Sequence, residues 1–189
     1  MRALDLQVFH AINGWPEWLS PLMVFLSEAT KQTPVRLFLV ALVVFLLARK
    51  NTRVMGFAAI LAFPIANEIC DVLKAAFQMA RPSVEVTDAI IRTAKLTSFG
   101  TASAHSANMA AVAFVFTAYS PRWGAIWIVL AFLTGLSRIY VGVHYPSQVL
   151  FGWAVGIFSG FLVVKTFEAY ARIRRKATDE PSANPGEQE

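Results

Sequence analysis

The chain has 189 residues, of which 56% are apolar and 15% are charged, and its mean hydropathy is +0.52. Soluble domains average about 45–50% apolar and about 25% charged residues, so this composition argues against a water-soluble protein and favours a single membrane domain. The net charge of +5 does not indicate a nucleic-acid partner, because many basic residues flank apolar runs, where they orient membrane proteins.

Residues 2–13 begin the chain as a predicted amphipathic helix that lies at the membrane interface. Asp5, His10 and Asn13 interrupt what would be the apolar core of a signal peptide, and no small-residue cleavage pattern follows cleanly. The positions expected to face lipid are Leu4, Leu6, Val8, Phe9 and Ile12.

Six apolar runs follow, and each is a candidate for a spanning helix, which needs about 20 mostly apolar residues. They cover residues 17–32, 34–49, 54–77, 103–119, 122–141 and 146–167. The first is short and contains Glu28, whereas the last starts at Pro146, which suits the first turn of a helix. We therefore predict an all-α bundle of six transmembrane helices over residues 1–170. A basic and then polar cytoplasmic tail over 171–189, disordered at its end, completes the chain.

Basic residues predict the orientation of this bundle. Arg49, Lys50 and Arg53 follow the second run, Arg122 follows the fourth, and a basic cluster follows the sixth, namely Lys165, Arg172, Arg174, Arg175 and Lys176. With six crossings these groups share one side with Arg2 and with both termini, and the positive-inside tendency makes that side cytoplasmic. The end of the third run, the start of the fourth, the end of the fifth and the start of the sixth then meet at the extracytoplasmic face.

That face carries polar residues that are unusual in membrane segments. Lys74 and Arg81 are separated by six residues, which places them on nearly the same face of an ideal helix, and Pro82 ends that helix. Two stacked cations suit a dianion, and the arginine fork matches phosphate oxygens. Snorkelling from a helix end is an equally good reading of this pair on its own.

The sequence Ser103-Ala104-His105 opens the fourth run. Unpaired N–H groups and the positive dipole at a helix start attract an anion. Ser103 either donates its hydroxyl to that anion or simply caps the helix. His105 needs a polar partner beside an apolar run, and Asn108, one turn later, is a candidate.

His144 follows Arg138 by six positions, at the start of the sixth run. A neutral imidazole can attack phosphorus, and an imidazolium can protonate a leaving oxygen, so two histidines can supply both roles near neutral pH. His10 lies in the surface helix and is interpreted as interfacial.

Three motifs in chain order carry a resemblance to a known family. They are Lys74-(six residues)-Arg81-Pro82, Ala102-Ser103-Ala104-His105 and Ser137-Arg138-(five residues)-His144. Together they resemble the signature motifs of the type 2 phosphatidic acid phosphatase superfamily, which includes vanadium haloperoxidases and bacterial undecaprenyl-diphosphatases. The resemblance covers residues 74–148 at motif level, and the six-helix layout extends it over about residues 1–170.

The resemblance implies that His144 is a nucleophile that passes through a phosphohistidine and that His105 is the general acid. It implies that the phosphoryl oxygens are held by Lys74, Arg81, Ser103, the N–H of Ala104 and Arg138. Fixed cations stabilise the charge that phosphoryl transfer spreads over these oxygens. Because the sequence contains no convincing cluster of metal ligands, we expect neither a metal nor another cofactor.

This chain departs from the family pattern at two places. The second motif usually reads Pro-Ser-Gly-His, and here alanines stand at positions 102 and 104, although Ala104 keeps its N–H. The third motif usually has Asp four residues after its histidine, where this chain has Gln148. Glutamine can accept a hydrogen bond from the imidazole but carries no charge. In another enzyme class, replacing the orienting Asp by its amide lowers the rate about 10⁴-fold.

The sequence thus predicts an integral membrane phosphatase for a phosphomonoester or diphosphate of a membrane lipid in the bacterial inner membrane. Undecaprenyl diphosphate is the first candidate substrate, followed by phosphatidic acid, phosphatidylglycerophosphate and lipid A phosphate. One alternative is a lipid phosphotransferase, in which an acceptor other than water attacks the phosphohistidine. The other is a catalytically impaired lipid-phosphate binder, which the glutamine at position 148 favours. The oligomeric state is left open.

Overall fold

The structure is a computed structural model that describes residues 2–179, and every regular element in that range is a helix. The α-helices are α1 (Arg2–Asn13), α2 (Ser20–Glu28), α3 (Thr33–Ala48), α4 (Arg53–Phe77), α5 (Pro82–Glu85), α6 (Ala104–Tyr119), α7 (Pro121–Tyr140) and α8 (Pro146–Asp179). Two 3-10 helices, η1 (Glu17–Leu19) and η2 (Ala29–Lys31), flank α2. The all-α prediction is confirmed. The predicted disordered run starts at Thr178, but Thr178 and Asp179 are the last residues of α8, and the rest of the run lies outside the described residues.

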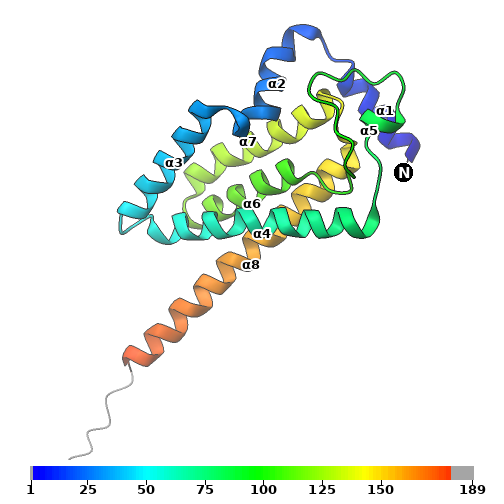
Figure 1. The fold of residues 1–189 in the computed structure, drawn as a ribbon. Helices are drawn as coiled ribbons and strands as arrows, with labels where there is room; N and C mark the ends of the chain where they lie inside the picture. Colours follow the sequence, from blue (N-terminus) through cyan, green and yellow to red (C-terminus); the bar gives the residue numbers. More distant parts are fainter. Residues whose placement is uncertain (1, 180–189) are drawn as a thin grey trace, which may run out of the picture.

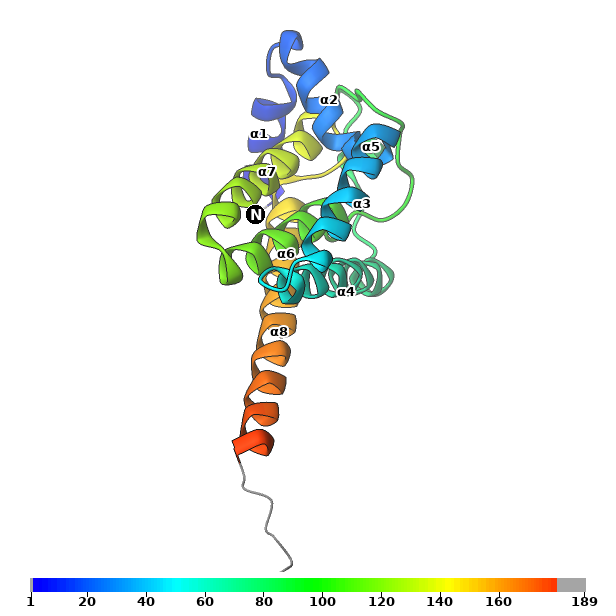
Figure 2. The same cartoon turned by 90° about the vertical axis from the view of Figure 1, so that its left-hand side faces the viewer.

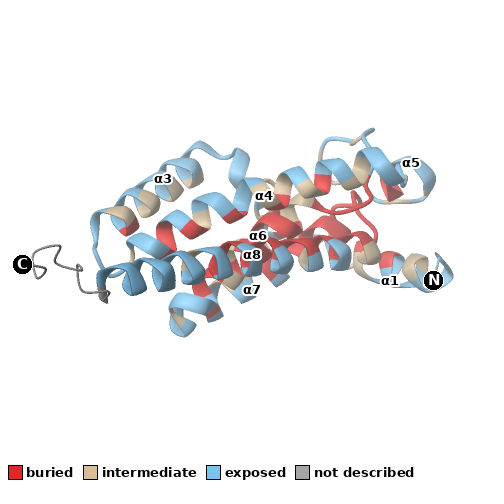
Figure 3. Cartoon of the chain, turned by 90° about the horizontal axis from the view of Figure 1, so that it is seen from below, coloured by how far each residue is buried: buried red, intermediate tan, exposed pale blue. Residues whose placement is uncertain are grey.

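Helix α6 lies at the centre of the bundle, with α4, α7 and α8 around it in both views (Figures 1 and 2). Its contact with α4 is built from small residues one turn apart, including Ala58, Ala62 and Ala66 of α4 and Ala107 and Ala111 of α6. Small side chains allow two helix backbones to approach closely where lipid surrounds a bundle. The buried residues are accordingly concentrated along α6 and the parts of α8 beside it (Figure 3).

A line of glycines on α8 fixes its register against α6. A Cβ atom at Gly152, Gly156 or Gly160 would lie 2.5, 2.1 or 2.9 Å from the carbonyl oxygens of Ser103, Ala107 and Ala111, respectively. From one contact to the next, the glycine moves four residues along α8 and the carbonyl moves four residues along α6. This register places the first turn of α6 beside the first turn of α8, so that the second and third motifs meet.

The number of membrane crossings differs from the prediction. Among residues 2–179, α4, α7 and α8 are long and apolar enough to cross a membrane, and α2 with α3 adds a fourth crossing if that bent pair counts as one. The pair bends by 58° at its break, and α2 has only 9 residues, too few for a crossing of its own. The predicted count of six is not confirmed.

Helix α1 lies at the same end of the bundle as the α7–α8 turn, because Asp5 accepts hydrogen bonds from the Ser147 N–H and hydroxyl at 2.8 and 2.6 Å. Arg2 pairs there with Glu85 at 3.3 Å. The predicted location of Arg2 beside the basic turn at residues 49–53 is therefore wrong, since that turn is at the opposite end of α4 (Figure 1). The prediction counted two antiparallel crossings over these residues, whereas α2 and α3 meet at a 58° bend and count together as at most one crossing.

The apolar face of α1 packs mainly on protein rather than on lipid. The helix itself, residues 2–13, is as predicted, but Phe9 is fully buried with Ile139, Tyr145 and Val149. Leu6 and Ile12 are half-buried against the same part of the core, so only Leu4 and Val8 of the predicted lipid-facing set are exposed. An interfacial location of α1 is not confirmed.

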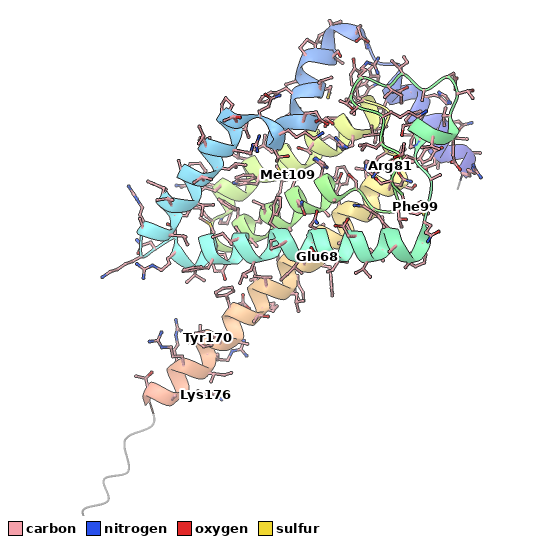
Figure 4. All side chains as sticks on the ribbon, viewed as in Figure 1. Glu68, Arg81, Phe99, Met109, Tyr170 and Lys176 are labelled. Atoms are coloured by element: carbon pink, nitrogen blue, oxygen red, sulfur yellow. The ribbon has the colours of Figure 1, made fainter. Side chains whose placement is uncertain are left out.

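Two predictions about helix ends are wrong, namely that Pro82 ends the helix of Lys74 and that the last helix stops near residue 167. Helix α4 ends at Phe77, because Gln78 adopts a left-handed conformation with φ of 46°. Arg81 is extended in front of Pro82, as residues before proline prefer, so Lys74 and Arg81 do not share a helix and Pro82 starts α5 instead of ending α4. Helix α8 continues through the basic stretch to Asp179 and extends beyond the other helices, as the positions of Tyr170 and Lys176 show (Figure 4).

Candidate active site

Four segments meet at the end of the bundle where α4 stops and α8 starts. They are the loop around Arg81, the first turn of α6, the last turn of α7 and residues 143–148. Figure 4 shows Arg81 and Phe99 together at this end, far from Tyr170 and Lys176 on α8. The structure thus brings the three sequence motifs to one end of the molecule.

The Arg81 guanidinium is buried and donates all of its five N–H groups to protein acceptors. Nε and NH2 bond to the carbonyl oxygens of Ser98 and Phe99 at 2.6 and 3.0 Å, and NH2 also reaches the Ser98 hydroxyl at 3.3 Å. NH1 bonds to the Val143 carbonyl at 3.1 Å and to Nε2 of His144 at 2.7 Å. A phosphoryl oxygen can accept a hydrogen bond from this guanidinium only if it replaces one of these partners. The other partners are backbone carbonyls and a serine hydroxyl, so His144 is the side chain that the phosphoryl group would replace.

The hydrogen bonds of His144 define its tautomer. Because an arginine can only donate, the Nε2 atom that faces Arg81 is an acceptor, and the ring proton is on Nδ1. Nδ1 lies 3.1 Å from Oε1 of Gln148. The lone pair of a neutral imidazole therefore points toward the cationic side of the site, which is the arrangement that a nucleophile requires.

The side-chain amide of Gln148 is itself held in one orientation. Its Nε2 donates to the Ala80 carbonyl at 2.8 Å, and its Oε1 accepts from the Tyr145 N–H at 3.2 Å. These two bonds turn the oxygen, and not the nitrogen, toward His144. The glutamine thus performs the orienting part of the role that the resemblance assigns to an aspartate, without supplying a negative charge.

Burial and nearby cations keep His144 neutral. Its side chain is buried, and desolvation followed by the positive charges of Arg81 and Arg138 lowers the pKa of His144 well below the ordinary value of 6.5. The hydrogen bond with Gln148 acts in the opposite direction, and the sum of these influences remains a lowered pKa.

The first turn of α6 is joined directly to His144 and its neighbours. Ser103 caps the helix by accepting from the Ser106 N–H at 3.4 Å, and its own N–H donates to the Gln148 carbonyl at 2.9 Å. The capping interpretation of Ser103 is therefore confirmed. The next residue, Ala104, starts the helix, so its N–H belongs to the unpaired donors that attract an anion.

Arg138 is buried and is held by α2. Its NH1 donates to the carbonyl oxygen and the hydroxyl of Ser27, and the same nitrogen lies 3.7 Å from Oε1 of Glu28. Its Nε is buried and has no hydrogen-bond partner within the described residues. Sequence reasoning missed both partners, although the acid at position 28 was visible inside an apolar run.

Lys74 is paired on its own helix, and His105 lines a cavity. Lys74 donates to Asp71 at 2.7 Å, and Asn67 donates to the other oxygen of the same carboxylate at 3.0 Å. His105 lines a cavity of about 400 Å³ together with Asn67, Asn108 and apolar residues of α2, α3, α4, α6 and α7. The buried side-chain oxygen of Asn108 has no partner among the described residues, so no bond between Asn108 and His105 is formed through that atom.

Two further polar residues brace the loop that carries Arg81. Asn13, at the end of α1, donates to the carbonyl oxygens of Ile90 and Tyr140 at 2.9 and 2.8 Å and accepts from the Ile90 N–H at 2.8 Å. Arg92 donates to the Tyr140 carbonyl at 2.8 Å and to Glu17. These bonds tie Ile90 and Arg92 to the end of α7, and only the polar interruption at Asn13 indicated them in the sequence.

No three His, Cys, Asp or Glu side chains within residues 2–179 are grouped as ligands for a metal ion. The side chains that surround His144 are instead cations and neutral hydrogen-bonding groups. Such a set suits an anionic ligand with several oxygens.

Comparison with known proteins identifies the family. The model of the PAP2 superfamily matches residues 53–172. The undecaprenyl-diphosphatase of Sulfolobus acidocaldarius is 32% identical over 165 residues, which cover 85% of this chain and 77% of that protein. The crystal structure of Aquifex aeolicus LpxE superposes with a TM-score of 0.74 at 27% identity, over 86% of this chain and 95% of that one.

A second solved structure agrees with the first. It is the transmembrane PAP2-type phosphatidylglycerolphosphate phosphatase from Bacillus subtilis, with a TM-score of 0.71 and 25% identity over 89% of this chain and 86% of that one. The matched residues contain all three motifs that meet at His144. The chain therefore belongs to the PAP2 superfamily and is a phosphatase.

Proposed function

We propose that this protein hydrolyses a phosphomonoester or diphosphate of a membrane lipid through a phosphohistidine at His144. The observation that carries the proposal is the pair of hydrogen bonds of His144. Its Nε2 accepts from Arg81, and its Nδ1 faces the amide oxygen of Gln148. These two bonds present the imidazole lone pair where a phosphoryl group held by cations would lie. A histidine with only a structural role needs no such lone pair beside a guanidinium.

The chemical steps follow from these positions. A phosphoryl oxygen replaces His144 as the partner of Arg81, and Nε2 attacks phosphorus while the bond to the leaving oxygen breaks. Protonated His105 donates its proton to that oxygen, and Lys74, Arg138 and the N–H groups at the start of α6 stabilise the charge on the equatorial oxygens. Water then attacks the phosphohistidine and releases phosphate, with neutral His105 accepting the proton from the water.

A lipid substrate is supported by the cavity that contains His105. Its walls include Phe25, Phe38, Leu39, Phe63 and Trp127, which suit a hydrocarbon chain. Its polar lining residues are Thr30, Asn67, His105, Asn108 and Thr134. Undecaprenyl diphosphate is our first candidate, in line with the name of the Sulfolobus relative. Phosphatidylglycerophosphate, phosphatidic acid and lipid A phosphate are the next candidates.

We also propose an orientation in the inner membrane. The basic turns at residues 49–53 and 122 and the basic end of α8 all lie at the end of the bundle away from His144. The positive-inside tendency assigns that end to the cytoplasm and the active site to the extracytoplasmic face. With α6 counted as a crossing and α2–α3 as one bent crossing, the chain crosses five times, and α1 lies beside the site.

Phosphate release from a panel of lipid phosphates in detergent tests this function. We expect release by the wild type, a loss of at least about 10³-fold in His144→Ala, and a near-normal rate in His10→Ala, since His10 is a partly exposed histidine on α1. Acid-labile label on His144 after brief reaction with ³²P-labelled substrate would support the covalent step. Absence of release from every lipid would refute the proposal, and release to an alcohol acceptor instead of water would identify a phosphotransferase.

A further inference from the structure

We propose that Lys31, in the break between α2 and α3, is a specificity residue that binds the second phosphate of a diphosphate substrate. The inference rests on the phosphatase function proposed above and adds a substrate class to it. Lys31 belongs to none of the three sequence motifs and follows the acid at position 28 in the least regular part of the transmembrane region.

The carboxylate of Glu28 joins Lys31 to the active site. Oε2 of Glu28 forms an ion pair with Nζ of Lys31, and Oε1 of Glu28 lies 3.7 Å from NH1 of Arg138. One carboxylate therefore bridges the two cations. The Arg138 side chain is 2% exposed, whereas that of Lys31 is 58% exposed. Of these two cations, Lys31 is therefore the one that an incoming anion can reach.

The break lies across the cavity from the general acid. Ala29 and Thr30 of η2 line the same cavity as Ala104 and His105 of α6. The position of η2 is fixed further by Arg36, which donates to the Lys31 carbonyl at 2.8 Å. Lys31 directly follows Thr30, so its backbone lies at the edge of this cavity, and its side chain is joined to the site through Glu28.

The leaving group explains why a cation is needed there. When Nε2 of His144 attacks a phosphomonoester, the P–O bond breaks and the oxygen departs as a neutral alcohol after it takes a proton from His105. When it attacks the terminal phosphorus of a diphosphate, the bridging oxygen departs on a lipid monophosphate that carries about −1.5 to −2 charges. A lysine beside the leaving oxygen stabilises that charge only in the second case.

The test compares two substrates and two matched lysines. Lys31→Gln removes the proposed contact, and Lys165→Gln is the control, because Lys165 forms a similar exposed pair with Glu168 at 2.8 Å three residues away. We expect Lys31→Gln to lower kcat/KM for a polyprenyl diphosphate about tenfold and to change kcat/KM for phosphatidic acid less than twofold. Lys165→Gln should leave both unchanged.

Binding of simple anions provides a readout that does not need turnover. Inorganic diphosphate should bind Lys31→Gln about tenfold more weakly than the wild type, while orthophosphate should bind both alike. Equal losses for both substrates, or an unchanged preference for diphosphate over monophosphate, would overturn the role of Lys31. A wild type that releases phosphate from neither lipid would instead refute the proposed function, and the anion measurements would still decide whether Lys31 contacts a second phosphate.

Discussion

The side-chain amide of Gln148 joins His144 to the loop before Arg81. Its Oε1 lies 3.1 Å from His144 Nδ1, and its Nε2 donates to the Ala80 carbonyl at 2.8 Å. An amide satisfies both neighbours, whereas a carboxylate would set an oxygen against the Ala80 carbonyl. The glutamine therefore fits this site as it stands, which argues against an impaired protein.

Substitution of Gln148 by either Glu or Asp should lower activity. Gln148→Glu keeps the shape but loses the bond to Ala80, and Gln148→Asp is too short to span the same two partners, so we expect kcat to fall about tenfold to hundredfold in both. Steady-state rates with ¹⁵N NMR of the histidine tautomer would check this. A rise in kcat for Gln148→Asp would mean that the glutamine impairs the native reaction.

The lowered pKa of His144 predicts how stability depends on pH. In the unfolded chain this imidazole takes up a proton below about pH 6.5, but in the folded protein it stays neutral, so stability is present above that pH and is lost as pH falls. The loss of stability should grow as pH falls further below about 6.5. Thermal unfolding in detergent, compared with His144→Asn, should show a steeper pH dependence for the wild type; identical slopes would contradict the prediction.

Alanine substitutions at the glycines of α8 should lower thermal stability to different extents. A Cβ atom would approach the α6 backbone most closely at Gly156, less at Gly152 and least at Gly160, at 2.1, 2.5 and 2.9 Å. Overpacking costs typically about 1–3 kcal/mol, partly offset by the better helix propensity of alanine. The Gly→Ala variants should therefore lose thermal stability in the order 156, 152, 160. A different order would show that α6 and α8 are not held together by this contact.

Substitution of Gly100 should lower activity and leave the fold intact. A Cβ atom at Gly100 would lie 2.7 Å from Cγ of Arg81 and 2.8 Å from Oε1 of Gln148, so Gly100→Ala displaces both partners of His144. Because small displacements of reacting groups cost up to about 10²-fold in rate, we expect kcat to fall at least about tenfold with little change in melting temperature. Gly56→Ala is the control, because its Cβ atom would meet leucine side chains at 3.1–3.6 Å, away from His144, and it should retain the wild-type rate.

The sequence alone determined the helical class, most helix positions and the motif residues, because these depend on local patterns. Hydropathy marked residues 54–77, 103–119 and 122–141 close to α4, α6 and α7, and Pro146 marked the start of α8. Motif spacing selected Arg81, Arg138 and His144 before any contact between them was known. Local periodicity and spacing are properties that a single segment carries by itself.

The tertiary structure decided the features that depend on contacts between distant segments. The contacts of α1 with Glu85 and Ser147 place Arg2 at the same end as His144, and the left-handed Gln78 detaches Arg81 from the helix of Lys74. The orientation of Gln148 is fixed by the Ala80 carbonyl, and Arg138 is held by Ser27 and Glu28. The bond between His144 and Gln148 is local, but Arg81, Ala80, Ser27 and Glu28 are all far in sequence from the residues that they contact here, so these contacts exist only once the bundle has packed.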